Sequence, residues 1–145
     1  MNGPLVRHRH VELRRSPLHG MGVFASGPIS AGELIEQCHV LPLERNWQRI
    51  DTVLNHYLFA WPHDGDGRAL AFGIASVFNH GDAPNVTWRT LVQAHRIDFR
   101  ALRDIAAGEE LLIDYGAEYW QQATRYSHPA SAPHRSILPV RLVDA

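Results

Sequence analysis

The chain has 145 residues, which is the size of one ordinary domain with a single core. Apolar residues make up 45% of it and charged residues 20%, a globular composition that excludes an intrinsically disordered protein. The formal net charge of −1 excludes the global basic field that draws proteins to nucleic acid, so we expect no direct nucleic-acid partner. The one cysteine, Cys38, excludes an internal disulfide and a cysteine-based zinc cluster.

Hydropathy along the chain predicts neither a membrane span nor a secretion signal. No stretch approaches the roughly 20 apolar residues of a spanning helix. The start of the chain runs straight into polar residues and lacks the apolar centre of a signal peptide. We therefore expect an intracellular protein with no membrane partner.

The N-terminal part of the chain predicts short strands separated by turns. Apolar and charged residues alternate weakly over residues 5–13, which indicates a strand. A glycine-containing turn follows at residues 16–22, and residues 23–25 resume an apolar run. After a turn at residues 31–32, residues 33–40 form the next expected strand.

The middle of the chain has the best helical pattern of the first half. Apolar residues recur at spacings of four, three and four over residues 43–54, which places them on one helix face. The aromatic segment 57–61 comes next, and Pro62 closes it. Residues 63–68 are polar and rich in glycine, so we expect the turn of a hairpin there.

The second half of the chain has several more short strand patterns and little helix. Residues 97–101 alternate apolar and charged side chains, which indicates a strand with one face in water. The remaining predictions are strands at 69–72, 86–88 and 111–113, a short helix at 118–123 and a loosely ordered tail at 127–145. Short strands punctuated by glycine and proline favour one mostly-β domain over residues 1–126.

Three segments, in this order, resemble the SET domain of protein-lysine methyltransferases. The first is the Gly-Met-Gly turn and apolar run at residues 20–25, with residues 29–35 after it. The second is Phe-Asn-His-Gly-Asp-Ala-Pro-Asn-Val at residues 78–86. The third joins Gly-Glu-Glu-Leu at residues 108–111 to Asp-Tyr-Gly at residues 114–116.

The resemblance implies a fold, an activity and partners. The fold would be mostly β and β-clip-like, with small curved sheets, few short helices and a C-terminal pseudoknot that brings Asn79 and His80 beside Tyr115. The activity would be methyl transfer from S-adenosylmethionine, leaving S-adenosylhomocysteine, to a lysine side chain of a protein or peptide such as a histone tail. No metal is implied. The pattern looks most similar to compact viral SET histone methyltransferases, which implies a homodimer in the cytoplasm or at host chromatin.

Several residues are implied to bind S-adenosylmethionine. Gly20 and Gly22 would let the backbone approach a ligand with no Cβ in the way, although a plain hairpin turn would also use them. Asn79 would hydrogen-bond the adenosyl part of the cofactor, yet asparagine is also a common turn residue. The implied set is His19, Gly20, Met21, Gly22, Asn79, His80, Tyr115 and Trp120.

Tyr115 is the implied catalytic residue, with its hydroxyl near the transferred methyl group. Methyl transfer from a sulfonium to an amine is an in-line displacement that needs a neutral nitrogen and an aligned approach. Positioning can lower such a barrier by up to about 7–11 kcal/mol, and a dry channel favours the neutral amine. The hydroxyl would orient the amine and stabilise the cationic centre. The plain alternative is a strand-end tyrosine with its hydroxyl in water.

The lysine channel is implied to have aromatic walls. Tyr57, Phe59 and Tyr119 occupy the matching substrate positions, and aromatic faces suit an alkyl stem that carries a cation. Phe59 fits a plain core position equally well. Trp120 could cover the adenine or simply pack as a C-terminal aromatic residue.

Two other patterns could suggest different chemistry. Residues 106–110 are turn-like, and we interpret Glu109 and Glu110 as part of a turn with structural contacts. Adjacent residues of a strand would point to opposite faces, which does not suit a paired-carboxylate hydrolase. His8 and His10 form no metal signature with the other histidines. Two alternatives to lysine methylation stay open, a catalytically silent SET-like module that binds a peptide and the methylation of a small amine.

Overall fold

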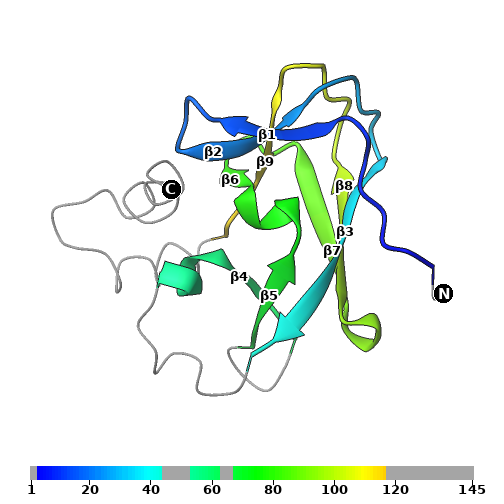
Figure 1. Ribbon diagram of the computed structural model, residues 1–145, viewed down its shortest axis with the longest axis vertical. Helices are drawn as coiled ribbons and strands as arrows, with labels where there is room; N and C mark the ends of the chain where they lie inside the picture. Colours follow the sequence, from blue (N-terminus) through cyan, green and yellow to red (C-terminus); the bar gives the residue numbers. More distant parts are fainter. Residues whose placement is uncertain (1–2, 44–52, 63–66, 117–145) are drawn as a thin grey trace, which may run out of the picture.

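The computed structural model describes residues 3–43, 53–62 and 67–116. In these ranges the chain forms two β-sheets and three short 3-10 helices (Figure 1). The strands are β1 (Val11–Arg15), β2 (Met21–Ala25), β3 (Leu34–Pro42), β4 (Leu58–Ala60), β5 (Arg68–Phe72), β6 (Asn79–His80), β7 (Val86–Leu91), β8 (Arg96–Ala101) and β9 (Glu110–Ile113). The 3-10 helices are η2 (Val53–Tyr57), η3 (Ile74–Val77) and η4 (Val92–Ala94). The prediction of a mostly-β domain with few short helices is confirmed.

Some predictions lie outside the described residues. They are most of the helix at 43–54, the turn at 63–66, the helix at 118–123, the tail at 127–145, and the site residues Tyr119 and Trp120. The pseudoknot also stays a prediction, because the chain beyond Gly116 would have to form it.

An antiparallel five-stranded sheet with the order β4-β5-β3-β8-β7 forms the larger layer. The long central strand β3 pairs with β5 on one side and β8 on the other. Along β3 the side chains alternate, so Cys38 and Val40 are buried while His39 and Leu41 are exposed. β4 and β5 pair with each other in antiparallel orientation.

The smaller sheet has the order β1-β2-β9-β6 and joins distant parts of the chain. β1 and β2 form an antiparallel hairpin, and β9 pairs with β2. β6 pairs with β9 in parallel, so that Asn79 lies opposite Leu112 and His80 opposite Ile113 (Figure 1). This parallel pair brings Asn79 and His80 to the strand that leads to Tyr115, as the family resemblance implies.

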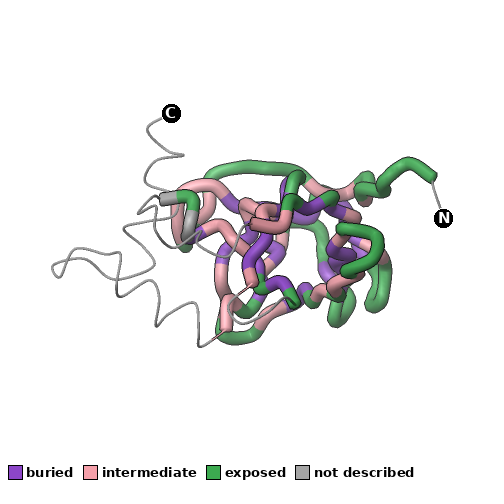
Figure 2. The backbone as a smooth tube through the Cα atoms, turned by 90° about the horizontal axis from the view of Figure 1, so that it is seen from below, coloured by how far each residue is buried: buried purple, intermediate pink, exposed green. Residues whose placement is uncertain are grey.

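The core lies between the two sheets and is built from apolar side chains of almost every strand. Figure 2 shows the buried segments in the middle of the molecule and the exposed ones around them. Phe99 is fully buried, and Phe59, Phe78 and Trp88 surround it with ring centroids 5.5, 5.4 and 6.2 Å away. Burying each such side chain contributes roughly 1.5–3 kcal/mol. This aromatic cluster joins β4, β7 and β8 to the segment that precedes β6.

The first predicted strand differs from the observed one. Regular pairing in β1 begins at Val11, and the residues before it bind the edge of β3 instead. The His8 N–H donates to the Ile35 carbonyl at 2.7 Å, and the Gln37 N–H donates to the Val6 carbonyl at 2.8 Å. The N-terminal segment therefore crosses from one sheet to the other, which a weak alternation pattern could not reveal.

The expected water-facing side of β8 is only partly in water. Arg100 is exposed, but Asp98 is buried, with 9% of its surface exposed. Arg96 Nε and Nη2 donate to the Asp98 carboxylate at 2.7 and 3.1 Å. Because the arginine satisfies both carboxylate oxygens, a charged residue can occupy this covered position.

Candidate active site

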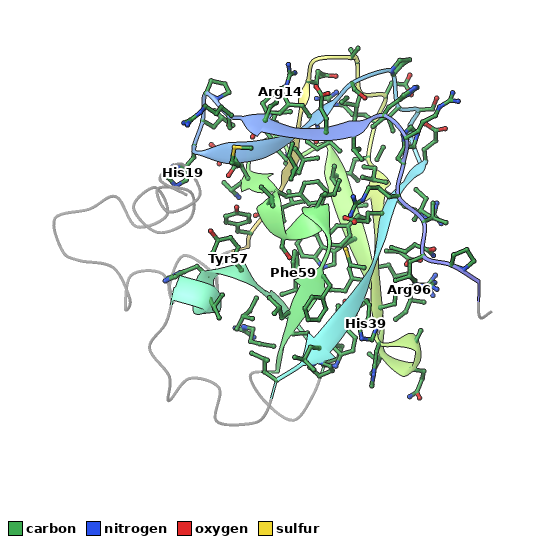
Figure 3. All side chains as sticks on the ribbon, viewed as in Figure 1. Arg14, His19, His39, Tyr57, Phe59 and Arg96 are labelled. Atoms are coloured by element: carbon green, nitrogen blue, oxygen red, sulfur yellow. The ribbon has the colours of Figure 1, made fainter. Side chains whose placement is uncertain are left out.

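A narrow pocket of about 80 Å³ lies between the β4 hairpin and the end of β9. Tyr57 at the end of η2, Phe59 on β4 and Tyr115 after β9 supply aromatic walls. Figure 3 shows Tyr57 and Phe59 in neighbouring positions along the η2–β4 segment. His56, Leu58, Ala75, Ser76, Phe78 and Trp88 line other parts of the pocket. The size and the aromatic lining suit an unbranched alkyl chain.

Phe59 is both a core residue and a wall of the pocket, the two roles that the sequence left open. Its side chain belongs to the core cluster with 8% of its surface exposed, and it also lines the pocket. Trp61 belongs to the same core cluster but does not line the pocket.

Two hydrogen bonds hold Tyr115 beside the pocket. Its hydroxyl donates to the Phe78 carbonyl at 2.6 Å, and its backbone N–H donates to His80 Nδ1 at 3.1 Å. Because the phenol proton is given to a carbonyl, the lone pairs of the oxygen can accept a hydrogen bond from a donor in the pocket. This hydrogen bond excludes the alternative in which the Tyr115 hydroxyl only contacts water.

His80 supports Tyr115 through one particular tautomer. Its Nδ1 accepts the Tyr115 N–H, so the ring proton of the neutral imidazole resides on Nε2. Nε2 lies 3.2 Å from Asp82 Oδ1, and Nδ1 lies 3.8 Å from Asp114 Oδ1. The rings of His80 and Tyr115 also contact each other, with centroids 5.4 Å apart. The histidine thus anchors the backbone from which the phenol projects.

Asn79 ties the turn between β1 and β2 to β9. Its Nδ2 donates to the carbonyls of His19 and Met21, both at 3.1 Å, and to Glu110 Oε1 at 2.8 Å. The residue is buried, with 5% of its surface exposed. Its Oδ1 accepts no hydrogen bond from the described residues. A buried amide oxygen of this kind can accept a hydrogen bond from a ligand amine.

The Gly-Met-Gly turn has a packing requirement that the sequence did not reveal. A β-carbon on Gly22 would collide with the carboxylate of Glu110 and lie 3.1 Å from Asn79 Nδ2. Glu110 in turn accepts a hydrogen bond from Ser16 Oγ at 2.8 Å. Gly20 adopts a positive φ of 48°, which glycine tolerates without strain. His19 lies at the tip of this turn (Figure 3).

The adjacent carboxylates of Glu109 and Glu110 point in opposite directions, as the strand period predicts. Glu110 points toward Asn79. Glu109 accepts hydrogen bonds from Arg103, which together with the Ala106 N–H lowers the pKa of its carboxyl. The pair cannot act on one substrate, and the interpretation of this segment as a turn with structural contacts is confirmed.

Sequence reasoning missed two buried polar residues near the site. Asn85 stood out only as part of the family segment at residues 78–86, yet its Nδ2 donates to the Glu110 carbonyl at 2.8 Å and its Oδ1 accepts the Leu112 N–H at 2.8 Å. Glu36 was interpreted as part of a strand, yet its carboxylate is buried and bonds the backbone of Ile74. Gln37 and His39 are also polar residues of this strand, so the local sequence did not distinguish Glu36.

Cys38 and the histidines do not suggest another chemistry. Burial, and in second place the nearby Glu36 carboxylate, raise the pKa of the Cys38 thiol well above its ordinary range. The thiol is therefore protonated at neutral pH and a poor nucleophile. Among the residues that the structure describes, no three histidine, cysteine or acidic side chains are grouped to hold a metal ion.

Comparison with known proteins decides the family. The family model of the SET domain matches residues 20–116, which include the Gly-Met-Gly turn, Asn79, His80 and Tyr115. A histone-lysine N-methyltransferase of Schizosaccharomyces pombe, specific for H3 lysine-37, is 37% identical over 123 residues, covering 83% of this chain and 82% of the relative. This chain belongs to the SET-domain family of protein-lysine methyltransferases.

Further relatives place the SET chain beside histone-directed enzymes. An H3 lysine-4-specific histone-lysine N-methyltransferase of Candida albicans is 32% identical over 135 residues, 81% of this chain but 12% of that protein. A solved candidate histone methyltransferase of Plasmodium falciparum matches with a TM-score of 0.61 and 26% identity, over 78% of this chain and 98% of that one. The solved Polycomb Repressive Complex 2 of Chaetomium thermophilum, a humanized mutant with the inhibitor GSK126, matches with a TM-score of 0.61 and 25% identity over 73% of this chain and 15% of that one.

Two predictions about the SET chain stay open beside these findings. The similarity to viral members of the family is one, and the homodimer is the other.

No helix in the described ranges is both long and apolar enough to cross a membrane.

Proposed function

We propose that this SET domain transfers a methyl group from S-adenosylmethionine to the side-chain amine of a lysine in a histone-like protein tail. The main support is Tyr115, whose hydroxyl is oriented by the Phe78 carbonyl at the side of a narrow aromatic pocket. A lysine side chain is a linear alkyl stem with a terminal amine, which is the shape and polarity that this pocket suits.

The residues around Asn79 fit the proposed cofactor. The buried Asn79 Oδ1 is an acceptor without a protein donor among the described residues, and an amino group of S-adenosylmethionine would satisfy it. His19, Gly20, Met21, Gly22 and His80 are the neighbouring residues that we propose to contact the cofactor. Trp120 is proposed for the same site on the family resemblance alone. When bound, S-adenosylmethionine supplies a methyl group activated by a positively charged sulfur.

The contributions of the chain's own residues follow from their hydrogen bonds. Tyr57 and Phe59 would hold the alkyl stem, together with Tyr119 if the family pattern applies. The Tyr115 hydroxyl donates its proton to the Phe78 carbonyl, so its oxygen would accept an N–H of the lysine amine. This hydrogen bond would direct the lone pair of the amine nitrogen away from the Tyr115 oxygen. With a lysine inserted, the aromatic walls would exclude water, which would favour the neutral amine over the ammonium. In this proposal Tyr115 orients the nucleophile and removes no proton.

The proposed substrate class comes from the relatives. The similar enzymes of Schizosaccharomyces pombe and Candida albicans act on histone H3. We therefore propose a lysine in a basic, extended segment of a histone or histone-like protein. This would place the enzyme with chromatin.

A calorimetric titration with S-adenosylmethionine tests the cofactor site. Asn79→Ala is compared with Asn85→Ala, because both asparagines are buried and both bond β9 or its side chains. Each variant should lose about 1–3 kcal/mol of unfolding free energy. Only Asn79→Ala should also weaken cofactor affinity, by about tenfold. Equal affinities in the two variants would contradict the assigned role of Asn79.

A radiolabelled methyl donor then tests the reaction. The 145-residue chain contains no lysine, since all 14 of its Lys and Arg residues are arginine. Label in lysines must therefore come from an added protein such as core histones, and label in the chain itself would reveal another nucleophile. A folded chain that binds the cofactor but labels neither histones nor lysine peptides would favour the silent peptide-binding module.

A further inference from the structure

Glu36 is a buried carboxylate with four hydrogen-bond donors around it. It lies on β3 with 3% of its surface exposed. The backbone N–H groups of Ile74 and Ala75 donate to it at 3.2 and 2.9 Å. Arg7 Nε and Nη2 donate to its Oε1 at 3.2 and 3.1 Å. The pair with Arg7 offsets the negative charge, and the backbone donors use the remaining lone pairs.

Core stability alone does not account for this arrangement. A buried ion pair often contributes no more to stability than apolar side chains of similar volume. The neighbours of Glu36 on β3, Ile35 and Cys38, are themselves fully buried. An apolar side chain at position 36 could be buried beside them in the same way. What an apolar residue could not do is accept two backbone N–H groups from another segment.

The segment that Glu36 binds leads directly to the proposed site. Ile74 and Ala75 begin η3, which connects β5 to β6. Gly73, just before η3, packs so closely on Glu36 and Cys38 that a β-carbon there would collide with both side chains. Fixing the start of a 3-10 helix of four residues also fixes its end, because the helix is a single short turn.

The end of η3 carries the atoms on which the proposed chemistry depends. The carbonyl of Phe78 accepts the Tyr115 hydroxyl at 2.6 Å. Asn79 follows at once and bonds the Gly-Met-Gly turn through the Met21 carbonyl. Ala75 and Ser76 within η3 line the pocket. Only two residues therefore separate Ala75, which the Glu36 carboxylate binds, from Phe78, whose carbonyl orients Tyr115.

We propose that Glu36, neutralised by Arg7, is a positioning residue for the proposed methyl transfer. Its carboxylate binds the start of η3 and thereby holds the Phe78 carbonyl and Asn79 where Tyr115 and the cofactor require them. This inference rests on the proposed function. It also links the N-terminal segment that contains Arg7 to the site, because Arg7 and Glu36 form an isolated β-bridge as well as an ion pair.

The test compares Glu36→Gln with Asp98→Asn. Asp98 is the matched control, since it is a buried carboxylate on the strand next to β3, bonded by Arg96, with no bond to η3. Both substitutions replace a carboxylate by an amide opposite an arginine. In Glu36→Gln the new amide N–H₂ must also face a donor, so at least one of the Ile74 and Ala75 N–H groups loses its acceptor.

Hydrogen exchange of the cofactor-free protein is the first measurement. We expect amides of residues 74–80 to exchange at least about tenfold faster in Glu36→Gln than in the wild type, with β7 and β8 unchanged. In Asp98→Asn the amides of residues 74–80 should keep wild-type rates. A uniform increase over all strands in Glu36→Gln would overturn the proposal, since it would mean that Glu36 supports the whole fold.

Affinity for S-adenosylmethionine is the second measurement. It should fall about five- to tenfold in Glu36→Gln and less than about twofold in Asp98→Asn. Equal affinity in wild type and Glu36→Gln would refute the positioning role. A wild type that binds no S-adenosylmethionine would instead refute the proposed function, and hydrogen exchange would still report whether Glu36 holds η3.

A second variant covers the case in which Glu36→Gln does not fold. Arg7→Gln keeps the carboxylate and removes its neutralising partner, and the Arg7 side chain is half exposed, so its replacement leaves no cavity. It should raise exchange at residues 74–80 in the same way, and Arg7→Lys should restore part of the protection. Wild-type exchange in Arg7→Gln would exclude the link from the N-terminal segment.

Discussion

The interior of the five-stranded sheet and the junction of β2, β9 and β6 are stabilised in different ways. Around Phe99 the rings of Phe59, Phe78 and Trp88 make apolar, aromatic contacts. At the junction, Asn79, Asn85 and Glu110 are polar, largely buried and bonded atom by atom. Apolar burial is roughly proportional to area and does not depend on direction, whereas a buried hydrogen bond depends on both the distance and the direction between its donor and acceptor.

This difference assigns separate tasks to the two regions. The apolar interior can provide most of the free energy of folding without specifying where any polar atom lies. The junction adds less free energy, yet it decides the positions of the Phe78 carbonyl, the Asn79 amide and the Tyr115 hydroxyl. Substitutions in the first region should therefore change stability, and substitutions in the second should change chemistry.

Phe99→Ala should give the largest effect and test the first half of that division. Removing a fully buried phenylalanine leaves a cavity and should lower the free energy of unfolding by about 3–5 kcal/mol. Chemical denaturation measures this loss. The fraction that stays folded at low temperature should bind S-adenosylmethionine within about threefold of wild type, and a much larger loss of affinity would show that the core also specifies the site.

Tyr115→Phe should give the opposite result. The hydroxyl donates one hydrogen bond, to Phe78, so unfolding free energy should fall by only about 1 kcal/mol. Methyl transfer to histones should fall about 10²–10³-fold, because the group that orients the amine is absent. Steady-state turnover and cofactor affinity are measured together, and the affinity should barely change. Turnover near the wild-type value would remove Tyr115 from the reaction.

Gly22→Ala should have a moderate effect on the junction. The added β-carbon would meet the Glu110 carboxylate and displace it from Asn79, which should destabilise the protein by about 1–3 kcal/mol. Gly3→Ala is the matched control, because a β-carbon there meets nothing within 4 Å. Thermal unfolding of both variants measures the difference. Equal melting temperatures would mean that Glu110 can move away freely.

Glu109→Gln should have the smallest effect, and its pH dependence has a definite sign. Arg103 lowers the pKa of the Glu109 carboxyl in the folded state, so the stabilisation is present above the ordinary glutamate pKa of about 4.3 and is lost as the pH falls below it. Because the pair is on the surface, we expect about 0.2–1 kcal/mol at pH 7 and a difference that shrinks as the pH falls through the lowered pKa of the Glu109 carboxyl. A difference that did not shrink on acidification would point to a contact other than the ion pair.

Much of the strand pattern could be predicted from local sequence. Apolar runs and turn residues predicted β2, β3, β5, β8 and β9 close to their observed bounds, whereas β7 extends three residues beyond its predicted end at Trp88. The prediction failed where the partner strand was unknown. Residues 5–8 bind β3 across a sequence gap of about thirty residues, and a local alternation pattern contains no information on such a partner.

The site residues were recognisable as motifs, but their contacts were not. Asn79, His80 and Tyr115 stood out because several family segments occur in order. Nothing in the sequence indicated that the Asn79 amide bonds two carbonyls of the Gly-Met-Gly turn, or that Gly22 must make room for Glu110. These contacts join residues about thirty to ninety positions apart, and turn propensity alone describes each residue only in its own loop.

The sequence by itself determined the mostly-β class, the alternating burial along the strands and the family to which the chain belongs, because periodicity and short motifs are local properties. Only the tertiary structure decided which polar groups meet in the interior. The parallel pairing of β6 with β9 sets Asn79 against Glu110 and His80 against the Tyr115 N–H, and the path of β3 sets Glu36 against η3. A buried donor and its acceptor must agree in distance and direction at once, and that condition belongs to the folded chain as a whole.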